Sequence, residues 1–264
     1  MIAVDIGGEI IAVRGEPALM RALEKRYAGF VVPVAAASSS LQVVITPDFR
    51  GDYAEPAKLA VALYGSRLVL DGCASGELDL ESGLGTLHNA SNLGEVDAAM
   101  RALAATRAPL RGRLLLHGMI TAARDGALVL AGESGAGKST AREVLGGACD
   151  EVVAIHVETL RASATPYWNG HAFTAPLRAI GVLSRGGSRV VATRGATAVR
   201  MLAAHVVRYV AYPPTERALF AGLAALARST VWVIEAPTGD AFSPFIRRVA
   251  ATLVESTRVT EVQQ

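Results

Sequence analysis

The stretch ALVLAGESGAGKST, residues 127–140, decides the class of fold. Its first five residues are apolar and predict a buried β-strand over Ala127–Ala131. Gly132–Ser139 then fits the pattern G-x-x-x-x-G-K-[ST] without a gap, and a helical stretch follows it. A strand, a glycine-rich loop and a helix in this order are the context that a phosphate-binding P-loop requires, and they disfavour a purely structural turn. The stretch therefore predicts an α/β core built around a P-loop.

Each residue type in this loop has a physical reason. Glycines at positions 132, 135 and 137 let the backbone approach phosphate oxygens with its N–H groups. The amine of Lys138 can reach the β- and γ-phosphates, and the hydroxyl of Ser139 is placed to ligate Mg²⁺. The positive end of the helix favours the same anion. We therefore expect ATP with Mg²⁺ at this loop. The predicted nucleotide-binding residues are Gly132, Glu133, Ser134, Gly135, Ala136, Gly137, Lys138, Ser139 and Thr140.

The chain is expected to divide near residue 108, into a smaller β-rich part (1–108) and a P-loop core (109–264). In the first part, short apolar runs alternate with Gly, Ser, Pro and Asp clusters, which is typical of strands and turns. The segment Ser75–Gly94 is rich in Gly, Ser and Asn and predicts a loop. The strands predicted here are Glu9–Val13, Leu41–Ile45 and Arg67–Leu70, and the helices are Pro17–Tyr27 and Glu95–Thr106, the second with Ser91 or Asn92 near its start.

After Pro109, strands alternate with helices, which indicates an α/β arrangement. A turn at Arg124-Asp125-Gly126 joins the first two strands. The strands predicted in this part are 113–120, Ala127–Ala131, Val152–Val157, Ala179–Leu183 and Val231–Ile234. The helices are one after the P-loop, Ala196–His205, Glu216–Ala227 capped by Thr215, and one from Pro244 capped by Ser243.

Composition excludes several classes of protein. About half of the 264 residues are apolar and the formal charge is +2, which is typical of a globular chain. Basic residues form no run or stripe with aromatic residues and no zinc-ligand spacing occurs, so we expect no nucleic-acid partner. Two cysteines suit a reducing cytoplasm. The N-terminus lacks the pattern of a signal peptide, and no apolar run of about 18 residues predicts a membrane span.

One segment resembles a known family. The stretch HGMITAARDGALVLAGESGAGKST, His117–Thr140, is similar to the nucleotide-binding segment of HPr kinase/phosphorylase, where a His-Gly strand, a hairpin and a G-[DE]-S-G-x-G-K-S loop have the same spacing. The stretch ATPYWNGHAFTAPLRAIGVL, Ala164–Leu183, resembles HPr-kinase-like proteins found beside peptide-modification genes, which have a Thr-Pro-aromatic-Trp element and then Pro-Leu-Lys/Arg-Ala. The resemblance covers roughly Leu114–His205. It implies a fold like the C-terminal part of phosphoenolpyruvate carboxykinase, and phosphoryl transfer to a hydroxyl.

The chain departs from this family at one place. In the kinases, the strand after the P-loop helix ends in two acidic residues that bind metal and take the proton of the attacking hydroxyl. A gapless comparison puts Ile155 and His156 at those positions. Asp150 and Glu151 supply an acidic pair only if a few residues are deleted. Both alignments stay open.

Helix length favours the gapless alignment. A helix from Lys138 runs away from the phosphates for about eight residues, at about 1.5 Å each. The turn at Gly146-Gly147 would then put Asp150 and Glu151 at the far end of the sheet. We therefore expect residues near His156 and Glu158 to return to the phosphate end.

The resemblance and the residue chemistry together give five catalytic candidates. His117 matches the family's active-site histidine, although a core histidine is the alternative. A neutral imidazole at His156 could accept a hydroxyl proton. Glu133 lies inside the loop, and an arginine can stabilise phosphoryl charge. The candidates are His117, His156, Glu133, Glu158 and Arg178.

Two functions remain open from the sequence. The first is an ATP-dependent kinase that phosphorylates a hydroxyl of a peptide, a protein or a small molecule. The second is a catalytically degenerate, nucleotide-binding partner protein, which the displaced acidic pair favours. HPr kinases form hexamers, so a homo-oligomer is compatible with the resemblance but does not follow from it.

Overall fold

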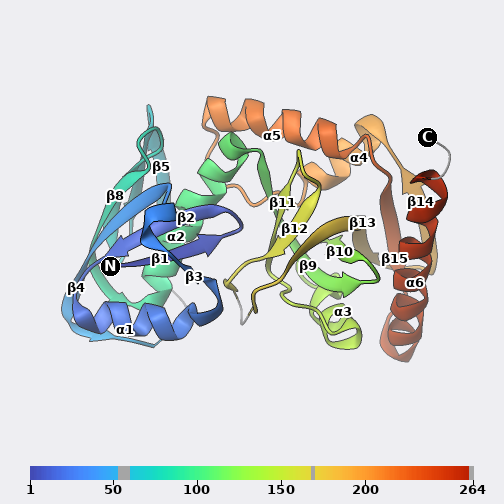
Figure 1. Ribbon diagram of the computed structural model, residues 1–264, viewed down its shortest axis with the longest axis horizontal. Helices are drawn as coiled ribbons and strands as arrows, with labels where there is room; N and C mark the ends of the chain where they lie inside the picture. Colours follow the sequence, from blue (N-terminus) through green and yellow to red (C-terminus); the bar gives the residue numbers. More distant parts are fainter. Residues whose placement is uncertain (53–59, 168–169, 262–264) are drawn as a thin grey trace. The chain divides into compact units, whose positions relative to one another are not determined.

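The computed structural model describes residues 1–52, 60–167 and 170–261, and it is a mixed α/β protein (Figure 1). The chain forms two compact units. The first comprises Met1–Arg111 and Arg208–Ala218, and the second comprises Gly112–Val207 and Leu219–Gln264. The segment Arg208–Ala218 therefore belongs to the first unit, although its neighbours along the chain on both sides belong to the second.

The first unit is built on an eight-stranded sheet in the order β3-β1-β2-β4-β8-β7-β6-β5. Neighbouring strands are antiparallel except for the two pairs β2–β4 and β4–β8. The strands are β1 (Ile2–Ile6), β2 (Glu9–Arg14), β3 (Val31–Val32), β4 (Ser39–Arg50), β5 (Ala60–Tyr64), β6 (Arg67–Asp71), β7 (Ser75–Asp79) and β8 (Leu84–Asn92).

Two helices belong to this unit: α1 (Pro17–Arg26) begins at the predicted Pro17, whereas α2 (Leu93–Arg107) begins at Leu93, two residues before the predicted Glu95. Helix α1 has its proline in the first turn, where a missing N–H costs nothing. Helix α2 is capped by Asn92, whose side-chain oxygen accepts from the backbone N–H groups of Gly94 (2.8 Å) and Glu95 (3.3 Å). Nearly all of α2 is buried, and it packs on β2, β4 and β8.

The prediction of a loop over Ser75–Gly94 is wrong, because this stretch forms β7, β8 and the start of α2. Strand β8 pairs with β4 on one side and β7 on the other. Only a few side chains in the two strands are buried, among them Leu78, Leu87 and Ala90. Gly, Ser and Asn residues stand between these buried positions, so the composition of the stretch resembles that of a loop.

A buried ion pair stabilises the same unit. The carboxylate of Glu9 is fully buried and lies 3.0 Å from Nε of Arg107 and 2.9 Å from Nε of Arg111. It also accepts from the hydroxyl of Ser39. Because a buried charge is costly without partners, this network fixes the start of β2 against the end of α2.

The second unit is built on a seven-stranded sheet in the order β10-β9-β11-β12-β13-β15-β14, and β10 also pairs with β13. Strand β10 is parallel to β13, β13 is parallel to β15, and the other pairs are antiparallel. The strands are β9 (Arg113–Ala123), β10 (Gly126–Ala131), β11 (Val152–His156), β12 (Arg161–Ala164), β13 (Thr174–Arg185), β14 (Arg189–Thr193) and β15 (Val231–Ala236).

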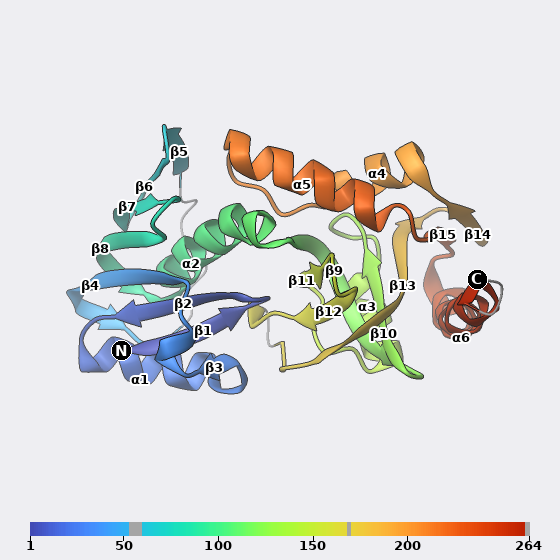
Figure 2. The same ribbon diagram turned by 45° about the horizontal axis from the view of Figure 1, so that its top comes forward.

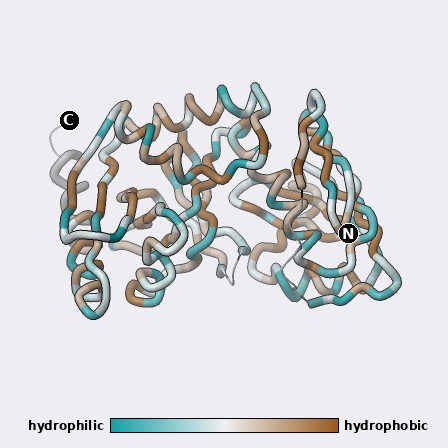
Figure 3. The backbone as a smooth tube through the Cα atoms, turned by 180° about the vertical axis from the view of Figure 1, so that it is seen from behind, coloured by the Kyte–Doolittle hydropathy of each residue, from teal (hydrophilic) through white to brown (hydrophobic). Residues whose placement is uncertain are grey.

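Helices cover both faces of this sheet (Figure 2). On one face, Leu202 of α4 (Gly195–Ala203) and Leu223 of α5 (Pro213–Leu226) pack on the same apolar cluster as Val129 of β10. On the other face, α3 (Lys138–Leu145) and α6 (Phe242–Glu261) pack on the cluster that holds Leu128 and Leu130. Alternate residues of β10 thus face two cores. Figure 3 colours the backbone by hydropathy, and hydrophobic and hydrophilic residues alternate along much of it.

The starts of two further helices, α5 and α6, differ from the prediction. Helix α5 begins at Pro213 rather than Glu216, because the hydroxyl of Thr215 does not cap it but donates to the carbonyl of Thr106 at 2.6 Å. Helix α6 begins at Phe242 instead of Pro244. Across the described residues, no helix combines the length and the apolar character that a membrane crossing needs.

Candidate nucleotide site

The loop over residues 132–139 connects β10 to α3, and its first residue is tightly enclosed. The backbone N–H of Gly132 donates to the carbonyl of His117 on β9 at 3.2 Å. A Cβ atom at Gly132 would lie 2.6 Å from the carbonyl oxygen of Leu183 on β13. Only glycine fits here, so the loop leaves the sheet at a fixed point between β9 and β13.

Two further glycines have backbone conformations that other residues rarely adopt. Gly135 has φ +80° and Gly137 has φ +104°. A Cβ atom at Gly137 would lie 3.0 Å from the ring of Phe242, at the start of α6, whereas nothing lies within 4 Å of a Cβ at Gly135. Glycine at 137 thus allows α6 to pack directly against the loop.

Lys138 is held inside the loop. Its side chain is 5% exposed, and its Nζ donates to the carbonyls of Gly132 (2.9 Å) and Glu133 (2.8 Å). Burial lowers the pKa of the Lys138 amine, while the negative charges of Glu151 and Asp150 raise it. Two carboxylates therefore act on the lysine of the loop.

The hydroxyl-bearing and acidic side chains of the loop are accessible. Unlike Lys138, which is buried, these residues lie at the surface of the unit. The exposed residues of this set are Glu133, Ser134, Ser139 and Thr140.

Glu151 lies beside the loop and beside His117. One carboxylate oxygen of Glu151 is 3.7 Å from Nε2 of His117, and the two side chains are 28% and 32% exposed. The backbone N–H of Gly118 donates to the carbonyl of Glu151 at 3.2 Å. The neighbouring Asp150 has one oxygen 3.5 Å from Nη1 of Arg142 on α3. Glu151 thus lies beside the imidazole of His117, and together with Asp150 it acts electrostatically on the amine of Lys138.

The expectation that Asp150 and Glu151 lie at the far end of the sheet is wrong. Helix α3 ends near Thr121, whose hydroxyl donates to the carbonyl of Leu145. After the helix, residues 148–151 run back along β9, before β11 begins at Val152. Backbone bonds join Ala148 to Ile120, Ile120 to Cys149 and Gly118 to Glu151. Residues 148–151, which follow the predicted turn at Gly146-Gly147, therefore already run back along β9 to the end of the sheet where the loop 132–139 begins.

His156 and Glu158 pass beyond the phosphate end, contrary to the expectation. In the register of β11 on β9, Val152 pairs with His117, whereas His156 pairs with Arg113. The difference is four residues, or about 13 Å at about 3.3 Å per residue. Nδ1 of His156 contacts the N–H and the hydroxyl of Thr159, and Glu158 is exposed in the same turn.

Arg178 also lies away from the loop. Its Nε donates to the carbonyl of Asp125 at 2.8 Å, in the turn before β10. Because β10 and β13 are parallel, with Ala127 opposite Leu177 and Ala131 opposite Val182, this turn is at the other end of β10 from the P-loop. The arginine fixes a hairpin and cannot reach a phosphate held by the loop without a rearrangement.

The structure adds one residue to which sequence spacing gives no role. The carbonyl of His205, just after α4, accepts from the backbone N–H of His117 at 2.7 Å. The His205 side chain is buried and interacts electrostatically with Glu133, Lys138 and His117. No local pattern joins residue 205 to the P-loop, because the contact depends on how the chain returns to β9.

The Thr-Pro-aromatic-Trp element has a structural place as far as it is described. The hydroxyl of Thr165 donates to the carbonyl of Val152 at 2.6 Å, and Tyr167 is fully buried. Trp168 lies outside the described residues. This element thus supports the first residue of β11, directly after Glu151.

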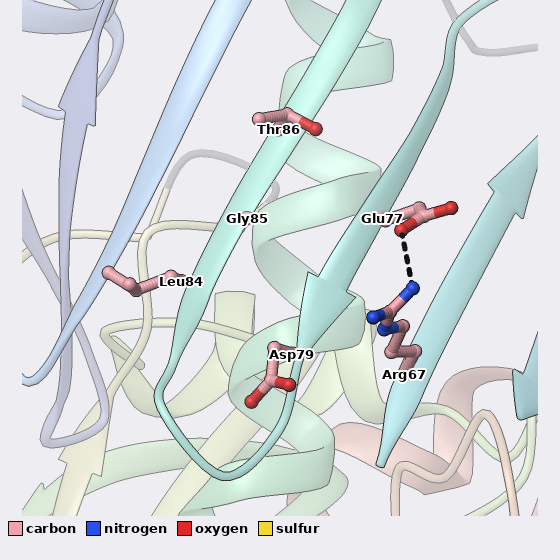
Figure 4. A pocket seen from close by; sticks show the side chains of 6 residues that line it. All are labelled: Arg67, Glu77, Asp79, Leu84, Gly85 and Thr86. Atoms are coloured by element: carbon pink, nitrogen blue, oxygen red, sulfur yellow. Dashed lines mark ion pairs between the residues drawn. The ribbon is translucent and has the colours of Figure 1, made fainter. Parts of the chain in front are cut away.

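A shallow pocket lies on the first unit, away from these residues in the chain (Figure 4). Arg67 on β6 forms an ion pair with Glu77 on β7 across 3.7 Å, and both side chains are more than half exposed. Hydrogen bonds from Ser82 and Glu81 lower the pKa of Asp79. The polar groups of this pocket are thus satisfied by their neighbours. Its lining residues are Arg67, Glu77, Asp79, Leu84, Gly85 and Thr86.

Comparison with known proteins adds no family. No protein-family model matches the sequence, and no curated protein matches it. Among the described residues, no group of three or more His, Cys, Asp and Glu side chains is arranged to hold a metal ion by itself.

Proposed function

We propose that this chain is an ATP-dependent kinase of the HPr-kinase-like type, which transfers the γ-phosphoryl group to a hydroxyl. The observation that carries the proposal is the position of Glu151, whose carboxylate lies 3.7 Å from Nε2 of His117 and raises the pKa of Lys138. A base, a cation and a phosphate cradle are the parts that phosphoryl transfer needs. The acceptor would be a peptide, a protein or a small molecule.

The residues of the loop fit a nucleotide triphosphate. Gly135 and Gly137 hold the backbone in conformations that expose N–H groups, and the N-terminus of α3 adds its positive end. Lys138 would exchange its two carbonyl partners for β- and γ-phosphate oxygens. Ser139 and Asp150 would hold Mg²⁺, which neutralises phosphate charge.

In the proposed reaction, the acceptor oxygen forms a bond to the γ-phosphorus while the bond from that phosphorus to the β–γ bridging oxygen breaks. The hydroxyl proton passes to the carboxylate of Glu151, and ADP leaves. His117, 3.7 Å from Glu151, would orient this carboxylate. Glu133 stays at the mouth of the loop, where its carbonyl already holds Lys138.

The rival function, a binding protein without catalysis, rested on a displaced acidic pair. Asp150 and Glu151 act electrostatically on Lys138, and this supports the kinase over the rival. The experiment below distinguishes the binding protein from the kinase.

The test measures binding and transfer separately. Calorimetry gives the affinity for ATP with Mg²⁺, and γ-labelled ATP with cell lysate gives transfer. We expect Lys138→Ala to lose binding. Glu151→Gln should keep binding and lose about 10²–10⁴-fold of the transfer rate, as expected for a general base. Glu143→Gln, at an exposed position of α3, is the matched control and should retain both.

Three results would speak against the kinase. Equal affinity of the wild type and Lys138→Ala would remove nucleotide binding at the loop. Equal transfer by the wild type and Glu151→Gln would remove Glu151 as the base. Measured ATP binding with no labelling above that of Lys138→Ala would favour the binding protein.

A further inference from the structure

His205 is fixed to β9 by its own backbone and by that of the residues that follow. The N–H of His117 donates to the His205 carbonyl at 2.7 Å, and the N–H of Val207 donates to the carbonyl of Leu115 at 2.8 Å. Leu116 and Val206 form an antiparallel bridge between them. Strand β9 pairs with β10 as far as Gly118, and the segment 205–207 pairs with the next residues of β9, 115–117. The position of His205 is therefore set by the sheet.

The first residue of the P-loop and His205 meet at one residue of β9. His117 accepts from the N–H of Gly132 through its carbonyl, and it donates to the carbonyl of His205 through its own N–H. Gly132 is also a partner of the Lys138 amine. Two hydrogen bonds on the backbone of His117 thus connect the histidine to the loop.

His205 is 8% exposed, and its side chain interacts electrostatically with charged groups of the loop and with His117 of β9. Burial is the main reason that its pKa is lower than usual. Glu133 on the loop raises the pKa, while Lys138 on α3 and His117 on β9 lower it. A lowered pKa favours the uncharged imidazole, and added negative charge at the loop would favour the charged form.

We propose that His205 is part of the nucleotide site and takes up a proton when a triphosphate binds, which supplies a second cation beside Lys138. The inference rests on the proposed binding of a triphosphate at the P-loop, and it does not depend on phosphoryl transfer. A triphosphate brings several negative charges into a partly desolvated site, where they favour a charged imidazole. His205 is thus a positioning residue for the phosphates.

The sign of the pH effect follows from this charge change. The bound phosphates raise the pKa of His205 from its lowered value in the free protein. Between these two values the bound state holds one more proton, so the affinity for the triphosphate rises as the pH falls. Each unit of the rise in pKa strengthens binding at low pH by at most about tenfold.

The experiment measures proton uptake by calorimetry, with ATP and Mg²⁺ in two buffers of different ionisation enthalpy. A titration with inorganic tripolyphosphate tests whether the phosphates alone are sufficient. The variant is His205→Gln, which cannot take a proton, and the control is His171→Gln, at an exposed position of the same unit. We expect His171→Gln to keep the proton uptake and the pH dependence of the wild type. His205→Gln should lose the proton uptake that is due to the imidazole. Its affinity for ATP at about pH 8, where histidine is neutral, should change little.

A second measurement covers the case in which His205→Gln does not fold. The chain has five histidines, so the ring resonances of the wild-type protein can be assigned by removing the other four in turn. Tripolyphosphate should raise the apparent pKa of the His205 ring by more than that of His171. Equal proton uptake by the wild type and a folded His205→Gln, or a His205 pKa that tripolyphosphate does not move, would overturn the proposal. Absence of any ATP binding would instead overturn the proposed function.

Discussion

Gly137 meets two demands at once. Its φ of +104° is a conformation that costs other residues about 1–2 kcal/mol, and the ring of Phe242 fills the space where a side chain would begin. Gly146, at the end of α3, meets only the first demand, because its φ is +69° and nothing lies within 4 Å of an added Cβ. Comparison of alanine variants at the two positions therefore distinguishes the cost of backbone strain from the cost of steric overlap with Phe242.

We expect Gly137→Ala to lower the free energy of unfolding by more than Gly146→Ala does. The difference should be about 1–3 kcal/mol, which is typical of an overpacked contact. Urea unfolding followed by circular dichroism measures both variants. In the Gly137→Ala background, Phe242→Leu should lose less stability than it does alone, since it relieves the overlap. Equal losses for the two glycine variants would show that Phe242 does not limit position 137.

Turns and helix starts were largely readable from the sequence, since they depend on residues close in the chain. Pro17 marks the first turn of α1, and Asn92 marks the cap of α2. The positions of Glu151 and His205 depend instead on how distant segments pair with β9. Counting residues along α3 could not show that Ala148–Glu151 already pairs with that strand.

The cap of α2 gives a prediction at the scale of one element. Asn92→Ala removes the acceptor for two backbone N–H groups and should cost about 0.5–2 kcal/mol of stability. Asn92→Asp keeps an acceptor and adds a negative charge at the helix N-terminus, so it should stay within about 0.5 kcal/mol of the wild type. Urea unfolding of both variants decides. Equal stability of the alanine and aspartate variants would mean that the cap contributes nothing.

At the scale of the whole molecule, the chain enters the second unit at Gly112, returns to the first at Arg208 and leaves it again after Ala218. Within the first unit, Thr215 from the returning segment bonds to Thr106 of α2, 109 positions away in the sequence. Truncation of the chain at residue 111 would remove this partner of α2. A fragment that ends near residue 108 would therefore lack the segment Arg208–Ala218, which belongs to the same unit and contacts α2.

Thr215→Val tests this contact with almost no change of shape. It leaves the buried carbonyl of Thr106 without its hydroxyl partner, so the first unit should lose about 1–3 kcal/mol. Thr174→Val in the second unit, where the hydroxyl bond to Ser163 is exposed, should lose less than about 0.5 kcal/mol.

Circular dichroism and tryptophan fluorescence can follow the urea unfolding of Thr215→Val. Circular dichroism reports both units, whereas both tryptophans belong to the sequence range of the second unit. Thr215→Val should shift the transition seen by circular dichroism to lower urea. If the tryptophan transition shifts equally, the two units unfold as one. No shift in either signal would mean that the bond contributes nothing to stability.

The middle of β9 has a consequence for how this protein can change over time. Leu115–Gly118 carries the backbone bonds to the P-loop, to Glu151 and to the segment after α4. These bonds tie the three segments to one short stretch of backbone, so a displacement of that stretch would move them together. Mutations in the outer helices can then accumulate without disturbing the spacing of these segments. A change at Gly118, where an added Cβ would lie 3.0 Å from the carbonyl of Leu130, would alter all of the attached groups together.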